Sequence, residues 1–247
     1  MLRKDAPRAR RGAPTGARDR NRLLAALSPG DLGLLQPHLT PITVEVRHVF
    51  ETPNRPIEHI YFMDAGIASV VAVQAGEDRV EVGLVGREGM TGTAVVLGGQ
   101  SSPHETYIQV RGEAQQIAVD ALKAAMQSSK PLHSLLLRYV HAFMVQTAHT
   151  AISNARANVD QRLARWILMA HDRITGDLLP LTHEFLALML GVRRAGVTEA
   201  VHALASRDLI EFHRGEIIVR NRKPLEKYAG HSYGVPEAEY KRLIHKF

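Results

Sequence analysis

No proline or glycine interrupts the chain from Leu132 to Val159, and this stretch divides the chain into two unlike parts. Its large apolar residues are spaced three and four apart, which predicts one long helix over residues 130–157. Such a wide apolar stripe needs a partner surface. We expect a second copy of the chain to provide it, and burial within a monomer is the alternative. The residues of the stripe are Leu132, Leu135, Leu136, Tyr139, Val140, Phe143 and Met144.

The part before this helix is predicted to be a β-barrel or a double-sheet roll. Residues 41–119 contain short runs rich in β-branched and aromatic residues, separated by Pro, Asn, Asp and Gly. Many short strands with regular turns are typical of these folds. A short helical segment, Leu23 to Leu35, precedes them and is interrupted at Ser28, where a new helix cap is expected. The expected strands are 42–46, 57–63, 67–73, 79–85, 107–110 and 114–119.

The net charge of +6 is unevenly distributed. Residues 1–22 hold eight Lys or Arg against two Asp, residues 23–159 are net −3, and residues 160–247 are net +3. The basic excess of the last third suits contact with a polyanion. Residues 1–22 have almost no apolar side chain to bury, so we predict a disordered basic tail and place no site there. A DNA-touching arm and a solubilising extension are the alternatives.

Composition excludes several classes of protein. The chain has no cysteine, and therefore neither disulfides nor a cysteine-ligated iron–sulfur cluster. No stretch approaches the roughly 20 apolar residues of a membrane helix, and no secretion signal is visible, so we expect a cytoplasmic protein without membrane contact. No two histidines lie three or four residues apart. No helix therefore offers a two-histidine chelate, and we predict no metal and no cofactor.

The last third has the pattern of a helix pair followed by a hairpin. Thr182 is a candidate cap for a helix over 185–190, and Gly191 suits the positive φ of a tight turn. A second amphipathic helix is predicted over 193–206. This order is typical of the winged helix-turn-helix, whose second helix enters the major groove of DNA. The expected strands of the wing are 209–212 and 216–220.

The beginning of the second helix is basic. The guanidinium groups of Arg193 and Arg194 are placed to reach guanine O6 and N7, and Arg214 at the hairpin tip to meet phosphate. A packed helix pair with solvated charges is the alternative, but here the turn, the hairpin and the basic start occur together. We therefore predict DNA binding, with no enzymatic activity and no catalytic residue.

Two segments give the chain a resemblance to the Crp/Fnr family of bacterial transcription regulators over about residues 23–230: Val159–Arg165 (VDQRLAR) and Leu181–Thr198 (LTHEFLALMLGVRRAGVT). The resemblance implies an α+β chain with a β-roll or jelly-roll barrel like a cyclic-nucleotide-binding domain, a long dimerisation helix and a winged helix-turn-helix. The implied segments are a tail at 1–22, a sensor barrel at 23–128, the helix at 129–158, the DNA-binding domain at 159–230 and a C-terminal extension at 231–247.

The resemblance also implies partners and site residues. The partners are double-stranded DNA with a palindromic operator and a second copy of the chain through residues 130–157, with RNA polymerase as a further candidate. Ala195 stands where many members carry a base-contacting Glu, so we expect a different half-site. The DNA contacts implied for the second helix and its surroundings are His183, Arg193, Arg194, Gly196, Thr198 and Glu199.

The sensor departs from the family pattern. Members that bind cyclic nucleotides carry a Gly-Glu pair followed by an Arg-Ser-Ala-like run, whereas this chain reads Gly89–Thr93 (GMTGT) and His104–Tyr107 (HETY). No arginine stands at the phosphate position, and Glu105 would repel the anion. We predict that cyclic nucleotide is not the ligand and leave the ligand unknown. Glycines recur every third residue from Gly83 to Gly92, where a structural turn is favoured over a phosphate-binding loop.

Two other functions remain as alternatives. A cupin-like, metal-dependent barrel enzyme would need histidines clustered with a carboxylate, but His48, His59 and His104 are isolated in the sequence. A non-DNA interaction module would use the long helix on a different partner.

Overall fold

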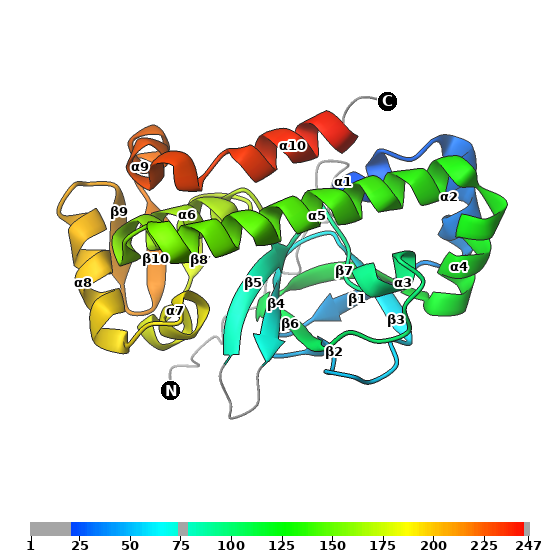
Figure 1. Cartoon of the computed structure of the whole chain (residues 1–247), viewed down its shortest axis with the longest axis horizontal. Coiled ribbons are helices and arrows are strands. Elements are labelled where there is room, and N and C mark those ends of the chain that lie inside the picture. The colour runs from blue at the N-terminus through cyan, green and yellow to red at the C-terminus, as the bar shows by residue number, and fades with distance from the viewer. Residues whose placement is uncertain (1–20, 74–78, 245–247) are drawn as a thin grey trace, which may run out of the picture.

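The computed structural model describes residues 21–73 and 79–244. The long helix α5 (Lys130–Arg156) runs along most of the molecule, with the β-barrel on one side and the C-terminal helix α10 (Val235–Ile244) on another (Figure 1). The helix pair α7 (His183–Leu190) and α8 (Arg194–Ala205) lies at the end of the molecule where α5 finishes. The predicted α+β class, with a barrel, a long helix and a winged helix-turn-helix, is confirmed.

Two residues of the expected tail, Asn21 and Arg22, belong to the folded chain, and the rest of that tail lies outside the described residues. Asn21 is fully buried. Its side chain caps α1 (Arg22–Ala25), and its amide donates to the carbonyls of Met63 at 2.9 Å and Gly89 at 2.7 Å. Asn21 therefore ties the start of α1 to the barrel, and the predicted tail boundary at residue 22 was wrong by at least two residues.

Two antiparallel sheets build the barrel. One has the order β1-β7-β3, and the other has the order β2-β6-β4-β5. The predicted strands 67–73 and 79–85 agree with β4 and β5, and Ser28 caps α2 as expected. The strand bounds are β1 Thr40–Val44, β2 Val49–Glu51, β3 His59–Met63, β4 Ile67–Val73, β5 Arg79–Val85, β6 His104–Val110 and β7 Gly112–Ala118.

Four of the six predicted strands differ from the observed ones at one or both ends. Val46 lies outside β1 with 55% of its surface exposed, and Val119 begins a helix, not a strand end. The strand β2 was missed, because three residues are too few for alternation to be visible. The shorter helices around the barrel are α2 Pro29–Leu35, the 3-10 turn η1 Gln36–His38, α3 Thr93–Val96 and α4 Val119–Ser128.

The glycine run is where the long helix crosses the barrel. A Cβ on Gly83 would lie 2.7 Å from the ring of Phe143, and one on Gly89 would lie 2.2 Å from the hydroxyl of Tyr139. The side-chain amide of Gln146 also pairs with the backbone of Leu84, accepting at 2.7 Å and donating at 3.2 Å. Glycine is needed because side chains of α5 pack directly on the backbone here. Gly83 lies within β5, whereas Gly86 and Gly89 lie in the turn that follows it, where a structural turn was predicted.

The apolar stripe of α5 is mostly used inside the chain. Leu132, Leu135, Leu136, Tyr139 and Val140 are buried in a core cluster formed with the barrel and with α1, α2, α4 and α10. Their assignment to a dimer interface was wrong, because helical spacing identifies an apolar face without showing which surface covers it. The opposite face of α5 is exposed and includes Met144 with 60% of its surface accessible.

The DNA-binding half follows α5 through a capped break in the helix. Asn158 and Gln161 form a reciprocal capping box at the start of α6 (Val159–His171). Arg165 of α6 donates to Thr150 Oγ1 of α5 at 3.1 Å, which fixes the angle of the two helices. The remaining elements are β8 Leu178–Pro180, β9 Ile210–His213, β10 Glu216–Val219, α9 Arg222–Ala229 and the 3-10 turn η2 Gly230–Ser232.

Candidate DNA interface

The turn between α7 and α8 is built as the sequence predicts. The hydroxyl of Thr182 accepts from the amide of Phe185, which caps α7. Gly191 ends the helix with φ of +59°, a left-handed conformation that favours glycine. The amide of Val192 then donates to the carbonyl of Ala187 at 3.0 Å. These contacts set the second helix across the first.

The inward and outward faces of α8 also agree with the sequence pattern. Val197, Ala200, Val201 and Leu204 are buried in the core of this half of the molecule. Arg193, Arg194 and Glu199 are exposed. Arg193 occupies the cap position of α8 without a side-chain hydrogen bond to the helix, and space is open where a Cβ on Gly196 would stand. The tip of α8 is therefore a basic, unobstructed helix N-terminus, a favourable place for phosphate and base edges.

His183 contacts both α8 and the wing. Its ring stacks on Phe212 of the wing with a centroid distance of 4.3 Å, and its Nδ1 lies 3.2 Å from the hydroxyl of Thr198. Partial burial, followed by the charges of Arg194 and His202, lowers the pKa of His183. The ring thus links α7, α8 and the wing. Its contact with the DNA backbone stays a prediction.

The wing is a three-stranded sheet with the order β8-β10-β9. The sequence predicts only the hairpin of β9 and β10, and β8 was missed because three residues carry no periodicity. Arg214 stands at the hairpin tip with φ of +43°, beside Gly215 with φ of +87°. Arg214 is exposed. The site residues predicted from sequence therefore fall on two neighbouring structures: the tip of α8 with His183 beneath it, and the tip of the wing.

The sequence did not indicate the link that joins this half to the barrel. The side chain of Glu81 on β5 is buried and accepts hydrogen bonds from Trp166 Nε1 at 2.6 Å and Ser69 Oγ at 2.6 Å. Burial raises the pKa of Glu81 to about 7, although both hydrogen bonds and the charges of Arg165 and Arg173 lower it. No sequence signal pointed to this residue, because the alternation of Val80, Val82 and Leu84 places Glu81 on the polar face of the strand.

The apolar core is continuous across the same boundary. Ile67, Leu84 and Val110 of the barrel belong to one buried cluster with the core of the helix-turn-helix. Trp166, Met189 and Val197 are members from the other side. Since these side chains exclude water together, the orientation of the DNA-binding half depends on the barrel surface beneath it.

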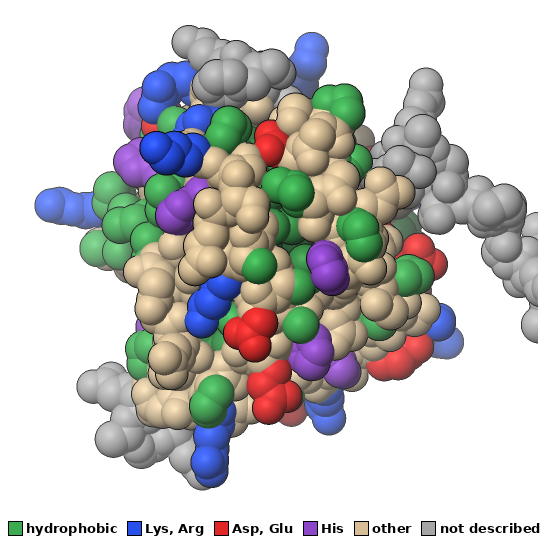
Figure 2. Space-filling view, turned by 90° about the vertical axis from the view of Figure 1, so that its right-hand side faces the viewer, with side chains coloured by type: hydrophobic (Ala, Val, Ile, Leu, Met, Phe, Trp, Pro, Cys, Tyr) green, Lys and Arg blue, Asp and Glu red, His purple; other side chains and the backbone are tan. Residues whose placement is uncertain are grey.

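Two carboxylates of the barrel already have partners within it. The carboxylate of Glu51 is buried and accepts from the amide of Gly92 at 2.7 Å, directly before α3. Burial raises the pKa of Glu51. Glu105, expected to repel a phosphate, forms an ion pair with Arg79, so its charge is partly offset. The end of the molecule that carries α2 and α4 shows acidic, basic and hydrophobic side chains intermixed (Figure 2).

Within residues 21–73 and 79–244, no group of three or more His, Cys, Asp or Glu side chains is arranged to hold a metal ion. Among the helices of those same residues, none combines the length and hydropathy required to cross a membrane.

A helix pair with an exposed basic N-terminus and an adjoining wing defines a DNA-binding transcription regulator. The Crp-like helix-turn-helix domain family matches residues 161–228. The global nitrogen regulator of Nostoc sp. is 24% identical over 177 residues, covering 68% of this chain and 79% of that protein. Residues 161–228 therefore match the Crp-like helix-turn-helix family, and the chain as a whole is similar to Crp/Fnr regulators, as the resemblance in its sequence implies.

Solved structures show the same fold. FixK2 from Bradyrhizobium japonicum has a TM-score of 0.67 at 15% identity, covering 77% of this chain and 96% of that one. A transcriptional regulator of the CRP family from Thermus thermophilus has a TM-score of 0.63 at 15% identity, with the same coverage of 77% and 96%.

Proposed function

We propose that this regulator acts in the cytoplasm as a homodimer that reads a palindromic DNA site. The observation that carries the proposal is the exposed basic N-terminus of α8. It follows the turn at Gly191 and lies beside His183, whose ring stacks on the wing. Arg193 and Arg194 would contact base edges, Gly196 would allow close approach, and the wing would contact phosphate. The remaining proposed contacts are Thr198, Glu199 and Arg214.

The dimer would form through the exposed face of α5. Exposed residues recur there at alternating intervals of four and three, the spacing of a coiled-coil seam. Leu137 is 40% exposed and Met144 is 60% exposed, although both are large and apolar. We call this face the α5 seam; it consists of Leu137, His141, Met144, Ala148, Ala151 and Ala155.

The ligand of the sensor is proposed to be something other than a cyclic nucleotide. Glu51 already supplies a carboxylate to the amide before α3. An incoming phosphate at that place would have to displace a buried carboxylate, and the sequence provides no arginine to receive it.

Arg194 provides the first test of base reading. Arg194→Ala is expected to cost about 1–3 kcal/mol of binding free energy at one base pair of each half-site, because a bidentate contact to guanine discriminates by that amount. The measurement is fluorescence anisotropy with duplexes that carry single base-pair changes. Arg207→Ala, just beyond the other end of α8, is the matched control and should leave the base preference unchanged. Equal weakening on every duplex would reduce Arg194 to a phosphate contact.

A further inference from the structure

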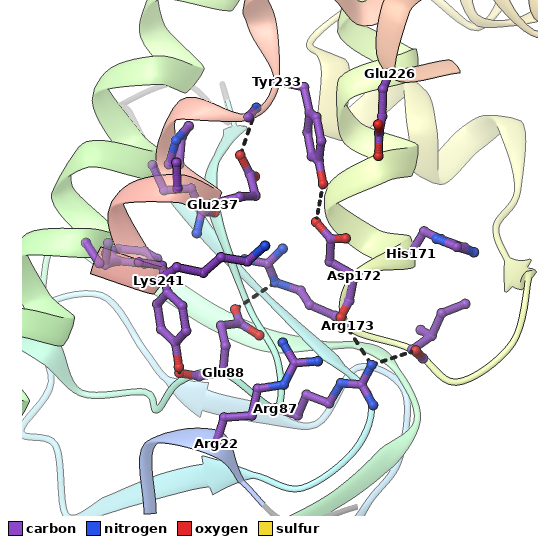
Figure 3. A pocket seen from close by; sticks show the side chains of 18 of the residues that line it. Arg22, Arg87, Glu88, His171, Asp172, Arg173, Glu226, Tyr233, Glu237 and Lys241 are labelled. Carbon is purple, nitrogen blue, oxygen red and sulfur yellow. Dashed lines mark hydrogen bonds and ion pairs between the residues drawn. The ribbon is translucent and has the colours of Figure 1, made fainter. Parts of the chain in front are cut away.

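A cavity of about 940 Å³ lies where all parts of the chain meet. Its walls come from the loop after β5, from α5, from the end of α6 and from the C-terminal helix α10 (Figure 3). Ligand sites in proteins fall between roughly 300 and 1,000 Å³. The cavity therefore has room for a small molecule, at a place that none of the proposed DNA contacts uses.

The deepest charges of the cavity are already paired. Arg173 is 7% exposed and contacts Glu88 at 2.8 Å, while its other nitrogens donate to backbone carbonyls of Met169 and Leu84. Arg222 contacts Asp172 at 2.6 Å. These ion pairs connect the walls of the cavity. Arg22 and Lys241, which are not part of either pair, face the cavity itself.

Two cations point into the cavity from opposite walls. Arg22 extends from the start of α1, and Lys241 extends from α10, on either side of the Arg173–Glu88 pair (Figure 3). Across the parts of the chain that the structure describes, no hydrogen bond or ion pair joins either side chain to another group. Arg87, beside Arg22, donates to the carbonyls of Asp172 and Ile174.

The carboxylates of the cavity are already engaged. Five of them line it together with five Lys or Arg side chains, and each of the five carboxylates contacts a neighbouring group. Arg22 and Lys241 have no such partner among the described residues, and their guanidinium and ammonium groups can donate charge-assisted hydrogen bonds to the carboxylate or phosphate of an anion. The carboxylates are Glu88, Asp172, Asp177, Glu226 and Glu237, and the cations are Arg22, Arg87, Arg173, Arg222 and Lys241.

The other side of the cavity is apolar. Ala142 and Phe143 of α5 and Ile174 after α6 line it, together with Pro236 at the start of α10. An ion without an apolar body would leave this wall in contact with water, whereas an organic anion would cover it.

We propose that this cavity binds a small organic anion, a carboxylate or a phosphate ester, with its charged group among Arg22, Arg87 and Lys241. Such a ligand would touch the barrel, the long helix, the DNA-binding half and the C-terminal helix together. It would therefore act as an effector outside the barrel interior. The effector role rests on the proposed DNA-binding function, but the binding step does not.

Isothermal titration calorimetry of the full chain tests the binding step. Benzoate, phenyl phosphate and inorganic phosphate are the probes: the first two distinguish carboxylate from phosphate, and the third lacks an apolar body. We expect one site per chain for benzoate or phenyl phosphate and weaker binding of inorganic phosphate. Arg22→Gln and Lys241→Gln should each weaken binding about tenfold, as expected for loss of one charge-assisted contact.

Lys130→Gln is the matched control, because Lys130 is exposed at the opposite end of α5 from the cavity. It should leave the affinity unchanged. No heat with any of the three probes would overturn the proposal, and so would an equal loss in Lys130→Gln, which would indicate unspecific charge attraction.

The effector role has a separate readout. At a concentration of the tighter probe near its wild-type Kd, the probe is expected to change the DNA affinity of the wild type and to change that of Lys241→Gln far less, because the variant is then mostly unoccupied. Probe binding without any change in DNA affinity would overturn the effector role. Absence of DNA binding altogether would contradict the proposed function while the calorimetric result still stood.

Discussion

Met144→Glu is expected to turn the proposed dimer into a monomer and to weaken binding to a palindromic site by about a hundredfold or more. Met144 lies on the α5 seam with 60% of its surface exposed, so the substitution places a charge where two copies would meet. In a symmetric dimer the two new carboxylates would face each other in a desolvated interface. A monomer then holds one half-site and loses the gain from binding two half-sites at once.

Sedimentation equilibrium gives the mass, and fluorescence anisotropy gives the affinity. Gln127→Glu is the matched control, because Gln127 is exposed on α4 and gains the same charge. It should leave both mass and affinity unchanged. Thermal unfolding should show a folded protein in both variants, since exposed substitutions usually change stability by less than about 0.5 kcal/mol. A Met144→Glu variant that stays dimeric would contradict the seam.

Glu81→Gln is expected to remove a large pH-dependent part of the stability. Burial raises the pKa of Glu81 from 4.5 to about 7. The folded state therefore prefers the protonated carboxyl. The stabilisation from this group is complete below about pH 4.5, falls as the pH rises towards 7, and is absent above. At 1.36 kcal/mol per pKa unit, the interval corresponds to about 3 kcal/mol.

Glutamine resembles the neutral carboxyl in shape and does not titrate. The difference in unfolding free energy between Glu81→Gln and the wild type should therefore move in favour of the variant as the pH rises from about 5 to about 7, and then stay constant. Urea denaturation across that range measures it. Glu113→Gln, on the exposed side of β7, should follow the wild type. If Glu81→Gln and the wild type show the same pH slope, the Glu81 pKa is not raised by burial.

Local patterns predicted the helix pair α7 and α8 well. Thr182, Gly191 and the spacing from Val197 to Leu204 each follow from rules that depend on a few neighbouring residues, namely capping, positive φ and helical periodicity. The structure agrees with all three. The strands β4 and β5 were predicted for the same reason, because each has enough residues for turn residues and β-branched side chains to be recognised.

Tertiary packing decided what the sequence left open. The apolar stripe around Leu136 and Tyr139 could not reveal whether the barrel or a second copy would cover it, and the barrel does. Asn21 follows a charged tail and gives no local sign that its amide bonds to Met63 and Gly89. Helix α10 and the cavity it closes depend on contacts between segments far apart in the chain, which no local pattern encodes.

Selection of bound duplexes from a random DNA pool is the most direct test of whether the N-terminus of α8 reads DNA bases. The account predicts enrichment of a palindrome whose half-sites are centred about one helical turn apart, ~34–36 Å, with protection of the same bases in a footprint. A variant carrying both Arg193→Ala and Arg194→Ala should enrich no such sequence. A pool that stays random with the wild-type protein, or the same palindrome enriched by the double variant, would contradict the claim that the tip of α8 reads DNA.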